Sequence, residues 1–195
     1  MGNNKPSSLK FALFTGTGAF FVAVFFSFFS EIVLPKLQMI ILSFFSLLIV
    51  IFVGIIFDMV GIAVAVADEK CFHAKASKKL HGASQSILMI RHAAKVATFC
   101  NDVVGDICGT VSGVFGVAIV FQLAAGRPSW DKSILTMLMT GIVAALTVGG
   151  KAFAKNKAMK GSEKIVGAVG RILAWFERAT GLNLFAFNRR RDRRR

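Results

Sequence analysis

Charged residues are scarce in this chain, and their scarcity excludes an ordinary soluble domain. Only 17% of the 195 residues are Asp, Glu, Lys or Arg, whereas 55% are hydrophobic and 20 are Phe. A soluble domain of this size needs far more polar surface. We therefore expect a small integral membrane protein.

Cysteine is also scarce, and the side-chain sets that mark enzymes are missing. Three cysteines, an odd number, argue against a disulfide framework. Cys71 and His73 have no second pair at a spacing that would complete a zinc site. No nucleophile, base and orienting group share a plausible pocket. We expect a protein that is not an enzyme.

What the chain has instead is long uncharged stretches. A bilayer-spanning helix needs about 20 apolar residues, and four segments approach or reach that length: residues 11–30, 37–57, 107–126 and 133–150. They lack the short alternating pattern of barrel strands. The predicted fold class is an all-α integral membrane protein with four transmembrane helices. The second segment stays apolar beyond Asp58, so its helix should tilt strongly or break near Gly54 or Gly61.

The formal charge of +14 is distributed unevenly along the chain. Two Lys lie in residues 1–10, six Lys and Arg lie in residues 68–95, and thirteen lie in residues 151–195. Basic connections thus alternate with connections that carry few charges, as the positive-inside rule describes. This pattern predicts a multi-pass protein of the cell membrane with both termini in the cytoplasm.

Two further segments read as helices at the cytoplasmic membrane surface. Residues 68–95 mix basic and apolar residues, which fits one or two interfacial helices. Residues 162–180 fit a juxtamembrane amphipathic helix with an apolar stripe of Ile165, Val169, Ile172 and Phe176. Within the third span, glycines at four- and three-residue spacing predict a helix-packing face: Gly105, Gly109, Gly113 and Gly116.

The C-terminal tail is rich in arginine, and it should bind anionic lipid headgroups. Its cationic residues are Arg189, Arg190, Arg191, Arg193, Arg194 and Arg195. No aromatic platform for bases and no recognised RNA-binding module accompanies them, which argues against a nucleic-acid partner.

Polar side chains gather where the third apolar segment begins. Asp102 and Asp106 are four residues apart and share a helix face, which Asn101 flanks. Oxygen ligands of this kind suit a hard cation such as Mg²⁺. Alternatively, the two acids lie among the headgroups and cap the helix N-terminus. By the topology, Asp58 and Lys151 end their apolar runs at a similar depth, so three acids and one ammonium could meet there.

Three segments resemble the transmembrane domain of the CorB, CorC and CNNM magnesium transporters. The stretch from Gly150 to Lys155, followed by Ser162-Glu163-Lys164-Ile165, resembles the G-E-x-x-P-K … P-E-K-[IV] end of that domain. The segment beginning Phe57-Asp58 resembles its F-S-x-x-E motif, and Cys100-Asn101 opens a segment that resembles G-N-x-x-x-N. The resemblance implies three core helices and a juxtamembrane helix, Mg²⁺ as the ion, and a homodimer.

The chain departs from that family at its most important position, because the cation-binding glutamate falls at Lys151. The resemblance divides the chain into an extra basic N-terminal helix (residues 1–36), a transporter-like core (37–180) and the Arg-rich tail (181–195). One hypothesis is divalent-cation transport or binding, with Asp58, Asn101, Asp102 and Asp106 as ligands and Lys151 as the charge-balancing group. The other is a non-transporting membrane adaptor in which Lys151 replaces the ion and the cytoplasmic face binds a protein partner.

Overall fold

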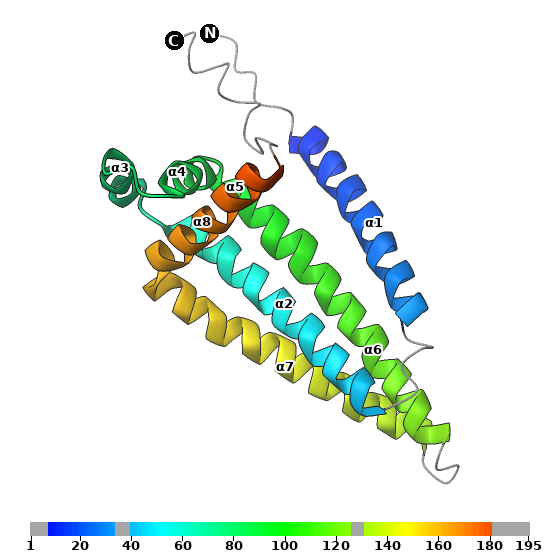
Figure 1. Cartoon of the computed structure of the whole chain (residues 1–195). Coiled ribbons are helices and arrows are strands. Elements are labelled where there is room, and N and C mark those ends of the chain that lie inside the picture. The colour runs from blue at the N-terminus through cyan, green and yellow to red at the C-terminus, as the bar shows by residue number, and fades with distance from the viewer. Residues whose placement is uncertain (1–7, 34–39, 126–130, 181–195) are drawn as a thin grey trace. The chain divides into compact units, whose positions relative to one another are not determined.

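The computed structural model describes residues 8–33, 40–125 and 131–180, and these parts are helical, without a β-strand. The elements, shown in Figure 1, are α1 Ser8–Val33, α2 Ile40–Val66, α3 Glu69–Ser77, α4 Ala83–Arg91, α5 Ala93–Ala97, the π-helix η2 Thr98–Gly105, α6 Asp106–Ala125, α7 Lys132–Lys160 and α8 Ser162–Thr180. The prediction of an all-helical chain is confirmed.

Three helical stretches are long and apolar enough to cross a membrane. They are Ile40–Val66, Ala93–Ala125, which runs through α5, η2 and α6, and Lys132–Lys160. In α1, the described apolar stretch Thr15–Phe25 is shorter than a span. The structure therefore supports a multi-pass membrane protein with three candidate spans, one fewer than the sequence predicts.

The expected alternative of a break in the second span is wrong, because α2 runs without interruption from Ile40 to Val66. Gly54 serves close packing instead. A Cβ atom at Gly54 would lie 2.8 Å from Cβ of Cys108, which a side chain cannot occupy without a shift. A single glycine costs a helix only about 1 kcal/mol, so the rest of this apolar segment stays helical across it.

The chain divides into two compact units. The first comprises Met1–Asp58 and Cys100–Ala154, and the second comprises Met59–Phe99 and Lys155–Arg195. In the first unit α1 lies along α6 (Figure 1), and the core holds Leu47, Ile51, Val103, Ile107, Val111, Phe115, Ile119 and Val143. The predicted glycine face is only partly correct. Gly116 packs closely on Val143 and Met139, but Gly109 and Gly113 have no such neighbour within 4 Å among the described residues.

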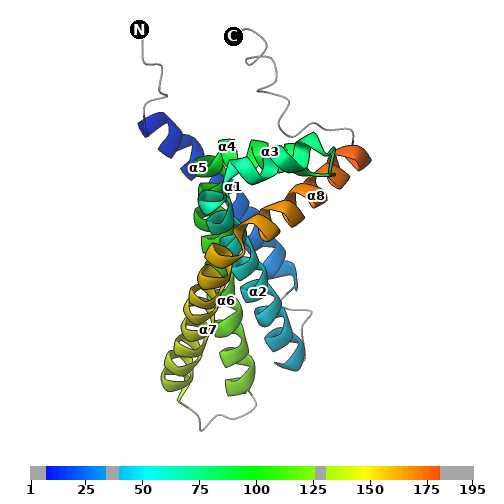
Figure 2. The same ribbon diagram turned by 90° about the vertical axis from the view of Figure 1, so that its left-hand side faces the viewer.

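In the second unit, α4 packs against both α3 and α8, as Figures 1 and 2 show. Asp68 starts α3 by accepting a hydrogen bond from the backbone N–H of Lys70 (2.9 Å). Gly82 precedes α4 with a φ of +83°, a left-handed conformation that favours glycine. The core holds Ala63, Val64, Phe72, Ile87, Met89, Ala158 and Val166.

The helices predicted within residues 68–95 and 162–180 are present as α3, α4 and α8, and the predicted α8 stripe is partly buried, because Ile165 and Val169 pack against the core of the unit. The buried residues of α8 are the small ones, Val166, Gly170 and Ala174. Ile172, Trp175 and Phe176 remain exposed by 64%, 72% and 44%. Helix α8 thus has a face of small residues that packs within the unit and a face of large apolar side chains that is exposed. The exposed face is available for contact with a membrane or another apolar surface.

Candidate functional site: a charged cluster around Gly105

The predicted polar segment adopts a π-helix from Thr98 to Gly105. π-Helices are rare in proteins, and those that are found lie frequently at functional sites. Hydrophobic periodicity does not reveal the change from α to π geometry, so sequence reasoning missed it. The π-helix places Asn101, Asp102 and Gly105 in one wide turn that ends directly before Asp106.

Gly105 lies at the centre of a charged cluster in the first unit. The residue is buried, and a Cβ atom built on it would lie 3.5 Å from Nζ of Lys151 and 3.9 Å from Oδ1 of Asp58. The carbonyl oxygen of Cys100 would lie 3.4 Å away. An ammonium from α7 and a carboxylate from α2 thus both approach the π-helix at Gly105.

Lys151 also forms an ion pair with Asp106, at 3.8 Å between Nζ and Oδ1. The pair is loose: the Lys151 side chain is 27% exposed and that of Asp106 is 74% exposed. Exposed pairs of this kind typically contribute about 0–1 kcal/mol. The structure therefore brings Asp58, Asp106 and Lys151 together without locking the Asp106 carboxylate.

Asn101 carries an unusual oxygen. Its Oδ1 is buried and has no hydrogen-bond partner among the residues that the structure describes. A buried carbonyl without a donor costs about 1–3 kcal/mol, so it calls for a physical explanation. A cation is one group that would satisfy this oxygen.

Asp102, the fourth predicted ligand, lies in the same π-helix. Its side chain is exposed, and within the described residues it forms no hydrogen bond or ion pair with Asp58, Asp106 or Lys151. In the same part of the chain, no group of three or more His, Cys, Asp or Glu residues could hold a metal ion. Any cation here would rest on two carboxylates, neutral oxygens and water. Mg²⁺ suits such a set, because it keeps several waters and uses one or two carboxylates.

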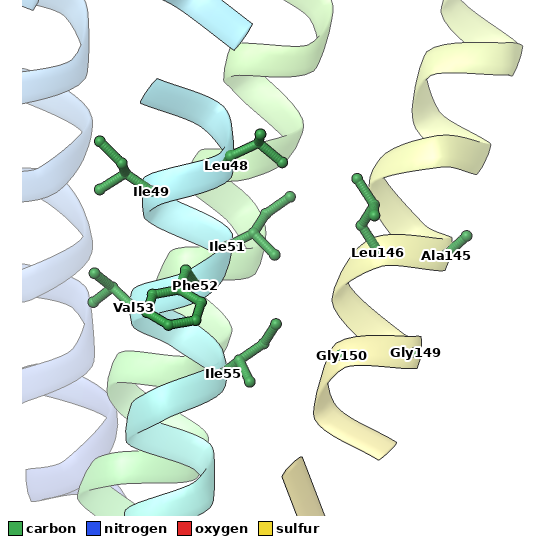
Figure 3. A pocket seen from close by; sticks show the side chains of 10 residues that line it. All are labelled: Leu48, Ile49, Ile51, Phe52, Val53, Ile55, Ala145, Leu146, Gly149 and Gly150. Atoms are coloured by element: carbon green, nitrogen blue, oxygen red, sulfur yellow. The ribbon is translucent and has the colours of Figure 1, made fainter. Parts of the chain in front are cut away.

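An apolar groove of about 650 Å³ lies between α2 and α7 and ends at Gly150, the residue before Lys151. Figure 3 shows Ile51 and Ile55 of α2 directed toward α7, where Gly149 and Gly150 carry no side chain. A Cβ atom at Gly150 would collide with the Ile55 side chain. Gly150 therefore permits the close approach of the two helices, and Lys151 is the next residue.

The predicted lipid-binding residues Arg189, Arg190, Arg191, Arg193, Arg194 and Arg195 lie outside the described residues. Comparison of the chain with protein-family models, with characterised proteins and with solved structures gave no match.

Proposed function

We propose that this chain is a multi-pass membrane protein that binds a divalent cation, with Mg²⁺ as substrate, in the charged cluster around Gly105. The observation that carries the proposal is Oδ1 of Asn101, an acceptor that is buried and receives no hydrogen bond from the part of the chain that the structure describes. Asp58 and Asp106 supply two carboxylates, and the Cys100 carbonyl lies beside them. Ionisable groups in membrane spans mark ion paths by default, so cation transport is the activity that this site serves.

Lys151 acts as the resident counter-charge in this proposal. Its ammonium stands where it compensates Asp58 and Asp106, and an incoming cation must displace it. The loose 3.8 Å pair and the flexible four-carbon stem of lysine allow such a displacement. Cation binding should therefore strengthen when the ammonium is removed.

A second candidate function rests on the same ion pair. If Lys151 stays with the acids permanently, it takes the place of the ion, and the protein is a non-transporting membrane adaptor. A paired charge is tolerated in a membrane where a lone charge is not. In that case the basic face carried by α3, α4 and α8 would bind a protein partner.

Both proposed functions share one arrangement of the helices in the membrane. We propose α1 as a fourth span, a homodimer in the cell membrane, and both termini in the cytoplasm because the basic segments alternate. Helices α3, α4 and α8 would lie at the cytoplasmic interface, where the exposed Ile172, Trp175 and Phe176 suit the acyl boundary. The Arg-rich tail would bind anionic lipid there.

Thermal unfolding of the purified full chain in neutral detergent, with and without Mg²⁺, tests the cation site. We expect millimolar Mg²⁺ to stabilise the wild type and Asn101→Ala to abolish that stabilisation. Lys151→Met should lower the Mg²⁺ concentration required for stabilisation at least tenfold, since removing about 1.4 kcal/mol of repulsion suffices for that factor. Lys155→Met, which removes an exposed ammonium one turn further along α7, is the matched control and should behave as wild type.

Two other outcomes decide against cation transport. A wild type that ignores Mg²⁺, beside a Lys151→Glu variant that is unstable until Mg²⁺ is added, supports the adaptor. If no variant responds to any divalent cation, the cluster does not bind cations.

A further inference from the structure

The second unit contains a pocket of its own, separate from the cluster around Gly105. Its volume is about 460 Å³, within the usual range for small-ligand sites. Helices α3, α4 and α8 and the turn before α4 line it. The fully buried Phe72 contributes an apolar wall, and Gly82 and Gly167 also line the pocket.

The charges that line this pocket are mostly positive. Lys75, His81, Lys164 and Arg171 border it, against a single carboxylate, that of Glu163. Glu163 is already engaged, because its Oε2 accepts a hydrogen bond from the Cys71 thiol (2.9 Å) and lies 3.9 Å from Nζ of Lys75.

Lys164 and Arg171 are left without an acidic partner. Lys75 is used by Glu163 and by the Phe72 ring, whose centroid lies 4.6 Å from Nζ. Within the described part of the chain, neither Lys164 nor Arg171 forms an ion pair. The pocket therefore has two uncompensated cations at its border.

The spacing of these two cations suits one ligand. They are seven residues apart on α8, which is two turns on the same face and about 10 Å along the axis. Their long side chains can converge over Gly167, which lies between them on the pocket wall. Arginine binds phosphate through two parallel N–H donors, and lysine adds a point charge.

We propose that the pocket between α3, α4 and α8 binds a phosphate-bearing organic anion through Lys164 and Arg171. The apolar wall at Phe72 accommodates the organic part of the ligand, and the two cations hold the phosphate. This chemistry is shared by the headgroup of an anionic phospholipid and by a soluble nucleotide. The proposal is independent of Mg²⁺ binding, because it uses none of the residues around Gly105.

The test is calorimetric titration of the full chain in neutral detergent. The probes are dihexanoyl phosphatidylglycerol, dihexanoyl phosphatidylcholine as the zwitterionic comparison, and ATP. Arg171→Gln should weaken binding of at least one of the two anionic probes about fivefold, and the Lys164→Gln/Arg171→Gln double variant about thirtyfold. Arg178→Gln, which removes an exposed charge of α8 outside the pocket, is the matched control and should bind as wild type.

The anionic probes also identify the source of the ligand. Selective loss of phosphatidylglycerol binding supports a lipid headgroup, and selective loss of ATP binding supports a soluble phosphate compound. The Arg-rich tail is present in every variant, so any binding through it cancels in the comparison. The proposal is overturned if the double variant binds both anionic probes as wild type, if Arg178→Gln weakens binding equally, or if phosphatidylcholine binds as tightly as phosphatidylglycerol. Unchanged unfolding temperatures verify that the variants fold.

Discussion

The two units of this protein bury their apolar side chains to different extents. In the first unit, large side chains of α2 such as Ile41 and Phe52 are exposed by 83% and 63%. In the second, Phe72 and Val166 are fully buried although the helices around them are short and charged. The first unit therefore depends on another apolar phase to cover its helices, as a membrane does, whereas the second completes much of its own core.

Polar contacts follow the same division. In the second unit, side chains distant in sequence are joined by hydrogen bonds such as Gln85 to Glu177 (2.9 Å) and Arg91 to Glu69 (2.8 Å). In addition to the charged cluster at Gly105, the first unit has a hydrogen-bonded pair between α2 and α6, Ser43 with Gln122 at 3.2–3.3 Å. Stability in the second unit should thus depend on close packing, and in the first on lipid and a few polar pairs.

The largest effect should follow from a side chain at Gly170. A Cβ atom there would collide with the Ser86 hydroxyl and lie 2.6 Å from the carbonyl oxygen of Gly82. Ser86 cannot move freely, because it is buried and donates to the carbonyls of Gly82 and Val166. We expect Gly170→Val to destabilise the second unit by about 3 kcal/mol, the upper range for overpacking, measured as the unfolding temperature of the full chain in detergent.

Gly109→Val in the first unit is the matched control. In the described part of the chain, no residue of another element lies within 4 Å of a Cβ atom at Gly109, so the added side chain should cost less than about 1 kcal/mol. Equal losses for the two variants would contradict the difference in packing between the units.

The sequence predicts most of the helices because apolar periodicity and charge indicate which residues of a helix must be shielded from water. The uncharged runs located α2, α6 and α7, and the basic, partly apolar segments located α3, α4 and α8. The α4–α8 contact was missed, since it depends on the absence of side chains at Gly82 and Gly170. Nothing in the sequence pattern marks Ser86 either, yet this residue is fully buried at the contact.

For the candidate site, topology alone indicated that Asp58, Asp106 and Lys151 lie at one depth. It could not reveal the π-helix, which leaves no periodic signal, or that the Asp102 side chain is exposed and forms no hydrogen bond or ion pair with the described residues of the cluster. The pocket on α8 was also missed, because Lys75, Leu80 and Arg171 meet only after α3, α4 and α8 have packed.

A smaller effect should follow from removing the polar pair of the first unit. Gln122→Leu removes the hydrogen bonds with Ser43, which is fully buried. Hydrogen bonds between membrane helices contribute about 0.6 kcal/mol on average and at most about 1.7. We expect a loss in this range in a bicelle unfolding assay, and the Ser43→Ala/Gln122→Leu double variant should lose no more than the two single variants combined. A loss above about 3 kcal/mol would show that the first unit relies on polar contacts more than its surface suggests.

The smallest effect concerns Glu69 on the surface of the second unit. The hydrogen bond from Arg91 holds the pKa of the Glu69 carboxyl below its ordinary value of 4.5, and the His73 side chain at 2.9 Å acts in the same direction. A carboxyl whose pKa is lower in the folded state than in the unfolded state contributes stability above pH 4.5, and that contribution disappears as the pH falls through the folded-state value.

The difference in unfolding temperature between wild type and Glu69→Gln should therefore be greatest at neutral pH and should shrink below pH 4.5. It should also shrink in high salt, since the contact is at the surface. Carbon-13 NMR titration of the Glu69 side chain measures the pKa directly, and in Arg91→Gln it should rise because the main cause of the shift is removed. A pKa at or above 4.5 in the wild type would show that these surface contacts do not favour the ionised carboxylate.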